Sequence, residues 1–109
     1  MRIRVRKVIL SGMVALPSGT VTFLFTDAEG STALLRRLGP EAYARELAAH
    51  RRVLRETCAG YSGVEVDTAG DSLFVAFARA ADAIAAARAA QAGLEGGKVR
   101  VRMGLHTGE

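Results

Sequence analysis

Two aspartates stand where the sequence pattern predicts the ends of β-strands. Asp27 follows the apolar run 21–26, and Asp71 comes just before the run 73–77. If these strands are antiparallel neighbours, the end of one lies beside the start of the other, and both carboxylates meet at one edge of the sheet. Like charges placed close together are costly unless a cation neutralises them, and carboxylate oxygens suit Mg²⁺ or Mn²⁺. The pair therefore indicates a divalent-metal site; the alternative is that each aspartate only caps a turn.

A short polar segment next to Asp27 adds an anion-binding feature. Gly30, Ser31 and Thr32 precede a short apolar set, and we expect Ser31 to be the N-cap of a helix there. Free backbone amides at a helix start beside a glycine form a concavity that binds anions. A carboxylate pair next to such a concavity is typical of a phosphoryl-transfer site. An ordinary capped loop is the alternative interpretation.

The elements that must position these residues alternate between strands and helices. The turn 68–71 between two strand-like runs predicts an antiparallel hairpin, and the Ala-rich stretch from Ala80 to Leu94 predicts a helix. Such an order gives an α+β fold with helices on one face of a mainly antiparallel sheet. The expected strands are 21–26, 64–67, 73–77 and 99–105, and the expected helices begin at Ser31, Pro40 and Ala80.

Composition excludes several classes of protein. The net charge of +4 comes from four basic residues within 2–7, and the rest of the chain carries eleven basic and eleven acidic residues, so no nucleic-acid partner is indicated. No apolar run approaches the ~20 residues of a membrane-spanning helix. The single Cys58 allows no internal disulfide, which favours a reducing, cytoplasmic location, and no His/Cys cluster could form a structural zinc site.

The first 18 residues are predicted to be a basic, disordered extension, and residues 19–109 to be the folded domain. A basic start followed by the apolar stretch 8–16 is partly similar to a signal peptide. Two small residues interrupt that stretch, however, and no cleavage site follows it. An upstream start, with Met13 as the alternative first residue, is the favoured interpretation.

Three segments carry a resemblance to a known family. TVTFLFTDAEGST, EVDTAGDSLFVAF and VRVRMGLHTGE follow one another in the order and spacing of a class III adenylate/guanylate cyclase catalytic domain, and they span residues 19–109. The resemblance implies a ferredoxin-like α+β fold. It also implies conversion of a purine nucleoside triphosphate to a 3′,5′-cyclic nucleotide and pyrophosphate, in intracellular signal transduction.

The resemblance further implies a role for individual residues. In this family two Mg²⁺ or Mn²⁺ ions activate the ribose 3′-hydroxyl, which attacks the α-phosphorus at a site formed between two subunits. A homodimer, or a second cyclase domain as partner, is therefore implied. The matching positions are Asp27 and Asp71 for the metal-binding aspartates, Ala28 for a backbone carbonyl on one metal, and Gly30, Ser31 and Thr32 for the amides that hold the triphosphate.

The sequence departs from the family pattern in two places. Asp67 stands where adenylate cyclases of the family carry a lysine that reads the purine. An ionised carboxylate only accepts hydrogen bonds, so it favours the N–H donors of guanine over adenine N1, unless it turns outward and purine selectivity is lost. The family's transition-state asparagine and arginine lie beyond residues 106–109. We therefore expect the domain to be truncated at its C-terminal side and this chain alone to be inactive and to self-associate.

Two other functions remain open from the sequence. A non-catalytic regulatory or dimerisation module would explain Asp67 and the expected truncation. A phosphatase of the haloacid dehalogenase kind has D-x-D-G-[ST] after a strand, which residues 27–31 approximate, but it requires a parallel sheet. Of the remaining polar candidates, we expect His50 at the surface or its boundary, Cys58 in the core, and His106 in a structural role.

Overall fold

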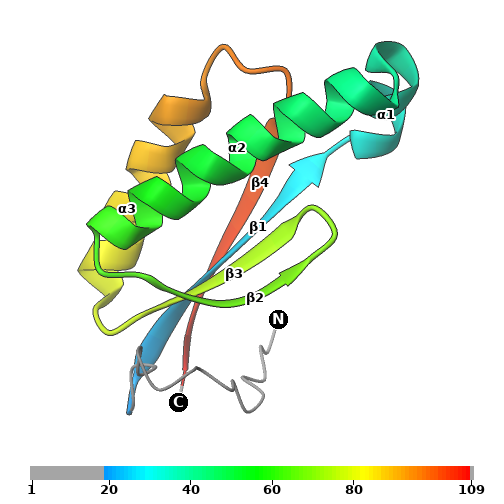
Figure 1. Cartoon of the computed structure of the whole chain (residues 1–109). Coiled ribbons are helices and arrows are strands. Elements are labelled where there is room, and N and C mark those ends of the chain that lie inside the picture. Colours follow the sequence, from blue (N-terminus) through cyan, green and yellow to red (C-terminus); the bar gives the residue numbers. More distant parts are fainter. Residues whose placement is uncertain (1–18, 109) are drawn as a thin grey trace.

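The computed structural model describes residues 19–108, so the predicted extension 1–18 lies outside the described residues. Every predicted element is present, and the order strand, helix, helix, strand, strand, helix, strand is confirmed. The elements are β1 (Val21–Glu29), α1 (Ser31–Leu38), α2 (Pro40–Gly60), β2 (Val64–Ala69), β3 (Ser72–Phe77), α3 (Ala80–Leu94) and β4 (Arg100–Gly108), as Figure 1 shows.

The four strands form one sheet in the order β2-β3-β1-β4, and every neighbouring pair is antiparallel. β4 pairs with β1 along its full length, from Val21 opposite Gly108 to Glu29 opposite Arg100. This is the strand order of a ferredoxin-like β-α-β-β-α-β fold, so the predicted fold class is confirmed. The phosphatase alternative is wrong, because no pair of strands within residues 19–108 is parallel.

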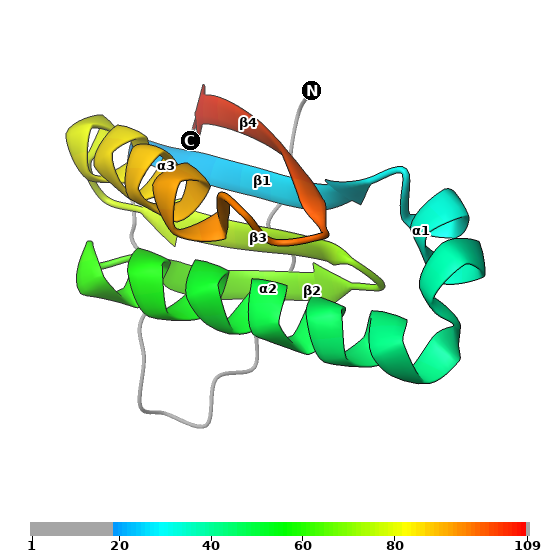
Figure 2. The same cartoon turned by 90° about the horizontal axis from the view of Figure 1, so that it is seen from above.

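Helices α2 and α3 cover one face of this sheet, while α1 lies beyond the end of β1 (Figures 1 and 2). Small side chains on α3 face the sheet, which lets the helix backbone approach it closely and fill the core without voids. Cys58 is 2% exposed, as expected for a core residue. The main core consists of Leu24, Leu54, Cys58, Leu73, Val75, Phe77, Ala83, Ala86 and Ala90.

The chain turns sharply between α1 and α2 at one residue. Gly39 has a φ of 84°, a conformation that favours glycine, and its N–H donates to the Leu35 carbonyl at 2.8 Å. Pro40 then begins α2, where its missing N–H costs no helical hydrogen bond. Among the helices of residues 19–108, none is long and apolar enough to cross a membrane.

Candidate functional site

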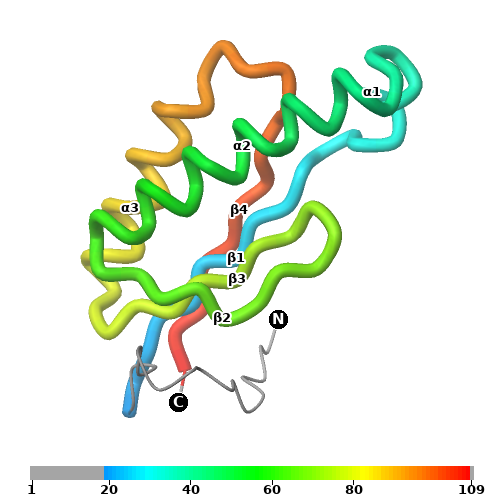
Figure 3. Tube along the Cα trace, in the orientation of Figure 1, coloured from blue at the N-terminus to red at the C-terminus, as the bar shows by residue number. Residues whose placement is uncertain are grey.

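Asp27 and Asp71 lie at the same end of the sheet. Thr26 is opposite Leu73, so the β2–β3 turn that contains Asp71 lies beside the last residues of β1, as the trace in Figure 3 shows. Asp27 does not end its strand as predicted, because β4 continues to pair with β1 as far as Glu29. The antiparallel pairing of β1 with β3, on which the expectation for the two aspartates depends, is nevertheless confirmed.

Asp27 is held by an arginine of the neighbouring strand. The Arg102 Nε donates to Asp27 Oδ1 at 2.9 Å and its Nη2 donates to Oδ2 at 2.8 Å, so both carboxylate oxygens are used. The Asp27 side chain is 15% exposed, whereas that of Arg102 is 66% exposed. The hydrogen bonds from Arg102 lower the pKa of Asp27 more than burial raises it. Asp27 is therefore ionised and already bound to a cationic group.

Asp71 acts electrostatically on groups from both sides of the sheet. Its charge adds to that of Asp27 in raising the pKa of Arg102. It also opposes the burial that lowers the pKa of His50, a residue of α2. Glu29 acts on Arg102 in the same way, so Asp71 is one of three carboxylates within electrostatic reach of Arg102 at this end of the sheet.

The segment after β1 has the backbone geometry of an anion site. Gly30, not Ser31 as predicted, is the N-cap of α1, because Gly30 has left-handed dihedral angles (φ 65°, ψ 31°) and its carbonyl accepts the first helical hydrogen bond, from Leu34 N. No side chain of the described residues caps this helix. The amides of Ser31 and Thr32 follow a left-handed residue, which is the arrangement that forms an anion-binding concavity.

A β-bulge determines which face of the sheet Asp67 occupies. Glu65 is opposite Val75 and Asp67 is opposite Phe74, so Val66 is an extra residue in β2. Without the bulge Asp67 would share the helix-covered face with Glu65, because side chains alternate along a strand. The bulge places it instead near Phe74 on the other face, which no helix of residues 19–108 covers and which is called the uncovered face below. Asp67 is exposed there, and its Oδ1 accepts a hydrogen bond of 2.8 Å from Thr68 N.

The uncovered face also carries apolar side chains. Phe25 and Phe74 are only partly buried, and their ring centroids are 4.9 Å apart. A second cluster on this face consists of Val21, Phe23 and Ala76. Two partly exposed aromatic rings beside Asp67 make this face suitable for contact with a purine or with another protein chain.

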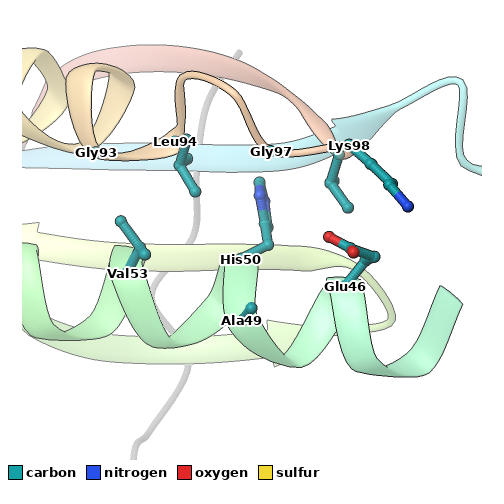
Figure 4. A pocket seen from close by; sticks show the side chains of 9 residues that line it. Glu46, Ala49, His50, Val53, Gly93, Leu94, Gly97 and Lys98 are labelled. Atoms are coloured by element: carbon teal, nitrogen blue, oxygen red, sulfur yellow. The ribbon is translucent and has the colours of Figure 1, made fainter. Parts of the chain in front are cut away.

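His50 is buried, so the expectation of a surface or boundary position is wrong. It is 3% exposed, and neither ring nitrogen has a hydrogen-bond partner among the described residues. It faces a cavity of about 150 Å³ between α2 and the α3–β4 connection, with Glu46 and Lys98 also in its lining (Figure 4). A cavity of this size has room for water molecules that could satisfy the imidazole.

The donor groups at this end of the sheet are carboxylates. Within residues 19–108 no group of three His, Cys, Asp or Glu side chains converges, and the strand register places Asp27 and the Asp71 turn at the same end of the sheet. Mg²⁺ is commonly held by one or two carboxylates, with phosphate oxygens and water completing its shell. Asp27 already binds a cationic group, and Asp71 adds a second negative charge nearby. The residues present therefore fit a divalent ion that is bound together with a phosphate.

Sequence reasoning missed Arg102. The alternation of Arg100 and Arg102 with apolar residues predicted the last strand and gave neither arginine a role. That pattern alone does not say which residue of β1 stands opposite, and the pairing of Arg102 with Asp27 depends on the register.

Comparison with known proteins places this chain in a family. The family model for the "Adenylate and Guanylate cyclase catalytic domain" matches residues 13–109. An uncharacterised protein of Mycobacterium tuberculosis is 40% identical over 95 residues, which make up 85% of this chain and 33% of that protein. Receptor-type adenylate cyclase A of Leishmania donovani is 45% identical over 67 residues, which make up 62% of this chain and 5% of that protein.

Solved structures show the same fold. An adenylate cyclase from Trypanosoma brucei in its monomeric state superposes with a TM-score of 0.74 at 27% identity, covering 88% of this chain and 59% of that one. The guanylate cyclase domain from Catenaria anguillulae in complex with GTP gives a TM-score of 0.73 at 18% identity, covering 82% of this chain and 56% of that one. The chain thus spans a third of the Mycobacterium relative and just under three fifths of these structures. The chain belongs to the adenylate and guanylate cyclase catalytic-domain family.

Proposed function

We propose that the chain supplies the metal- and phosphate-binding part of a nucleotide cyclase that makes a 3′,5′-cyclic nucleotide and pyrophosphate from a purine nucleoside triphosphate, in cytoplasmic signal transduction. One observation carries the proposal: the β1–β3 register brings Asp27 and the Asp71 turn to one end of the sheet, beside the Gly30 concavity. Carboxylates next to free amides suit a metal-bound phosphate chain. Membership of the cyclase family supports the assignment.

Each residue of this site has a distinct part in the proposal. Asp27 and Asp71 hold two Mg²⁺ or Mn²⁺ ions, with the Ala28 carbonyl as a further oxygen ligand. When bound, the ions supply positive charge that makes the ribose 3′-hydroxyl a better nucleophile and stabilises the charge on the phosphates. The amides of Ser31 and Thr32, after Gly30, bind the triphosphate oxygens and orient the chain of phosphates.

The base is proposed to be guanine more readily than adenine. The bulge at Val66 turns Asp67 to the uncovered face, where Phe74 offers an aromatic surface. An ionised carboxylate there accepts from the N–H donors of guanine, while it would face the lone pair of adenine N1. If Asp67 keeps its bond to Thr68 N and does not reach the base, purine selectivity is lost instead.

The uncovered face is proposed to bind a second cyclase domain, as a homodimer or with another partner. Phe25 and Phe74 would be buried by that contact, which would also enclose the site. Dimerisation without catalysis is the second candidate function, and Asp67 in place of the family's lysine favours it. Light scattering tests the contact: Phe25→Lys is expected to convert a dimer to a monomer, and an unchanged mass would contradict it.

The metal site is tested by calorimetry of Mn²⁺-dependent nucleotide binding. Asp27→Asn and Asp71→Asn each remove one negative charge and are expected to weaken binding by about tenfold or more. Asp82→Asn in the first turn of α3 is the matched control for a lost carboxylate, and it should leave the affinity unchanged. Equal affinity in all four proteins would contradict the metal site.

The base assignment is tested in a chain that carries the whole cyclase domain. Turnover of ATP and GTP is compared before and after Asp67→Lys, which replaces an acceptor with a donor. We expect the preference to move toward ATP by about tenfold, the cost of one mismatched buried hydrogen bond. Glu65→Lys, on the opposite face of β2, is the control. A strong ATP preference that neither variant changes would contradict the role of Asp67.

A further inference from the structure

The Asp27–Arg102 pair already has the form of an occupied cation site. Both oxygens of Asp27 accept hydrogen bonds from one guanidinium, at 2.9 and 2.8 Å, and the carboxylate is largely enclosed. The guanidinium, by contrast, extends from the open face of β4 into solvent, where its long side chain can adopt other rotamers. The group that holds the largely enclosed carboxylate is therefore itself mostly exposed to solvent.

A divalent ion needs the same carboxylate oxygens. A metal bound to a carboxylate at ~2.0–2.6 Å takes the lone pairs that the guanidinium uses here, and two cationic groups on one carboxylate repel each other. We propose that Arg102 takes the place of the metal ion in the ligand-free chain, so that a divalent cation binds Asp27 only in exchange for Arg102. The inference rests on the proposed function, because it takes Asp27 as a metal ligand.

The charges around the pair support an exchange. Glu29 and Asp71 also attract the guanidinium, so Arg102 offsets part of the negative charge that these carboxylates and Asp27 bring to this end of the sheet. A released Arg102 would remain within the field of Asp71. Arg102 thus stabilises the metal-free chain and at the same time lowers its metal affinity, and these two effects are measurable separately.

A neighbouring arginine gives a matched control. Arg100 lies two residues earlier on the same face of β4, opposite Glu29 rather than Asp27. The structure records no hydrogen bond from its side chain to Asp27. Substituting Arg100 removes the same unit of charge from the same strand, and it leaves the oxygens of Asp27 engaged. Any effect specific to Arg102 therefore comes from its contact with Asp27.

The experiment measures binding of Mn²⁺ alone to the 109-residue chain, by the electron paramagnetic resonance signal of free Mn²⁺. Arg102→Gln is expected to bind Mn²⁺ about tenfold more tightly than the unchanged chain, because a charge-assisted bidentate contact no longer competes. Arg102→Lys keeps the positive charge but cannot donate to both carboxylate oxygens at once. Its Mn²⁺ affinity should therefore lie between those of Arg102→Gln and the unchanged chain. Arg100→Gln should change the affinity by less than about twofold. Equal or weaker binding by Arg102→Gln would overturn the exchange.

Thermal unfolding supplies a second readout. In the presence of a chelator, Arg102→Gln should unfold at a lower temperature than the unchanged chain. Added Mn²⁺ should raise the midpoint temperature of unfolding more for Arg102→Gln than for the unchanged chain. Asp27→Asn separates the two proposals. If it abolishes Mn²⁺ binding while Arg102→Gln leaves binding unchanged, the exchange is wrong and the metal site stands. If Asp27→Asn leaves Mn²⁺ binding unchanged, the proposed metal site is wrong, and so is the proposed exchange of Arg102 for a metal ion.

Discussion

The two faces of the sheet differ in which of their side chains are buried, although the same strands build both. Toward the helices, Leu24, Val75 and Phe77 are at most 2% exposed and pack into the main core. On the uncovered face, Asp27 and Phe25 of the same β1 strand are partly exposed. Because side chains alternate along a strand, each strand contributes to the core with every second residue and to the candidate site with the others. The candidate chemistry therefore lies on one face, although Val21, Phe23 and Ala76 on that same face are also buried.

Truncating one phenylalanine on each face tests this difference most strongly. Phe77 is fully buried under the helices, so Phe77→Ala should lower the free energy of unfolding by about 3–5 kcal/mol, the usual cost of a large core cavity. Phe25→Ala removes a partly exposed ring and its contact with Phe74, which should cost about 1 kcal/mol. Urea unfolding followed by circular dichroism measures both. Equal losses would show that the uncovered face contributes to stability as much as the core.

Two glycines allow the opposite test, the addition of a methyl group. A Cβ at Gly63 would lie 2.7 Å from Phe77 Cζ and 2.7 Å from Val75 Cγ1, whereas a Cβ at Gly104 would meet no atom within 4 Å. Gly63→Ala should therefore destabilise the chain by about 1–3 kcal/mol through overpacking. Gly104→Ala, on the uncovered face, should change stability by less than about 0.5 kcal/mol. An unchanged free energy of unfolding in Gly63→Ala would mean that the side chains of Val75 and Phe77 can shift to accommodate the added methyl group.

The covered face was the easier one to predict from the sequence. Apolar alternation, the hairpin turn 68–71 and the residues around Pro40 give the strands, the hairpin and the helix boundaries from local chemistry alone. Cys58 was expected in the core from its place on the apolar side of the second helix, and it lies there. The approach of Asp27 to Asp71 was also predictable, since it needs only the antiparallel order of two strands.

The uncovered face depends on details that local patterns do not contain. The Asp27–Arg102 pair requires the register of β4 on β1, which long-range packing determines over a separation of 75 residues. The orientation of Asp67 requires the bulge at Val66, which has no turn residue to mark it. The sequence predicts Ser31 as the N-cap because serine side chains commonly cap helices. In the structure the left-handed backbone of Gly30 makes that glycine the N-cap, and no side chain caps the helix. Candidate-site residues were therefore identifiable by type but not by their partners.

His50 is a buried histidine of α2 on the helix side of the sheet, and its titration gives the last prediction. Burial and the charge of Arg51 lower the pKa of this imidazole, and the attraction of Asp71 offsets them in part. The folded chain therefore takes up a proton at His50 less readily than the unfolded chain does. It follows that stability should fall as the pH drops below about 6.5, the unperturbed value for histidine, with a slope of at most about 1.4 kcal/mol per pH unit.

Replacing His50 by leucine should remove that slope between pH 7 and pH 5. Leucine fills part of the 150 Å³ cavity and leaves no unpaired ring nitrogen, so the stability at pH 7 should change little. Urea midpoints at several pH values measure the slope, and His106→Gln on β4 controls for the loss of a histidine. The carboxylates of Asp27 and Glu65 do not interfere, because their lowered pKa values place their contribution at more acidic pH. A slope that persists in His50→Leu would assign the acid sensitivity to another group.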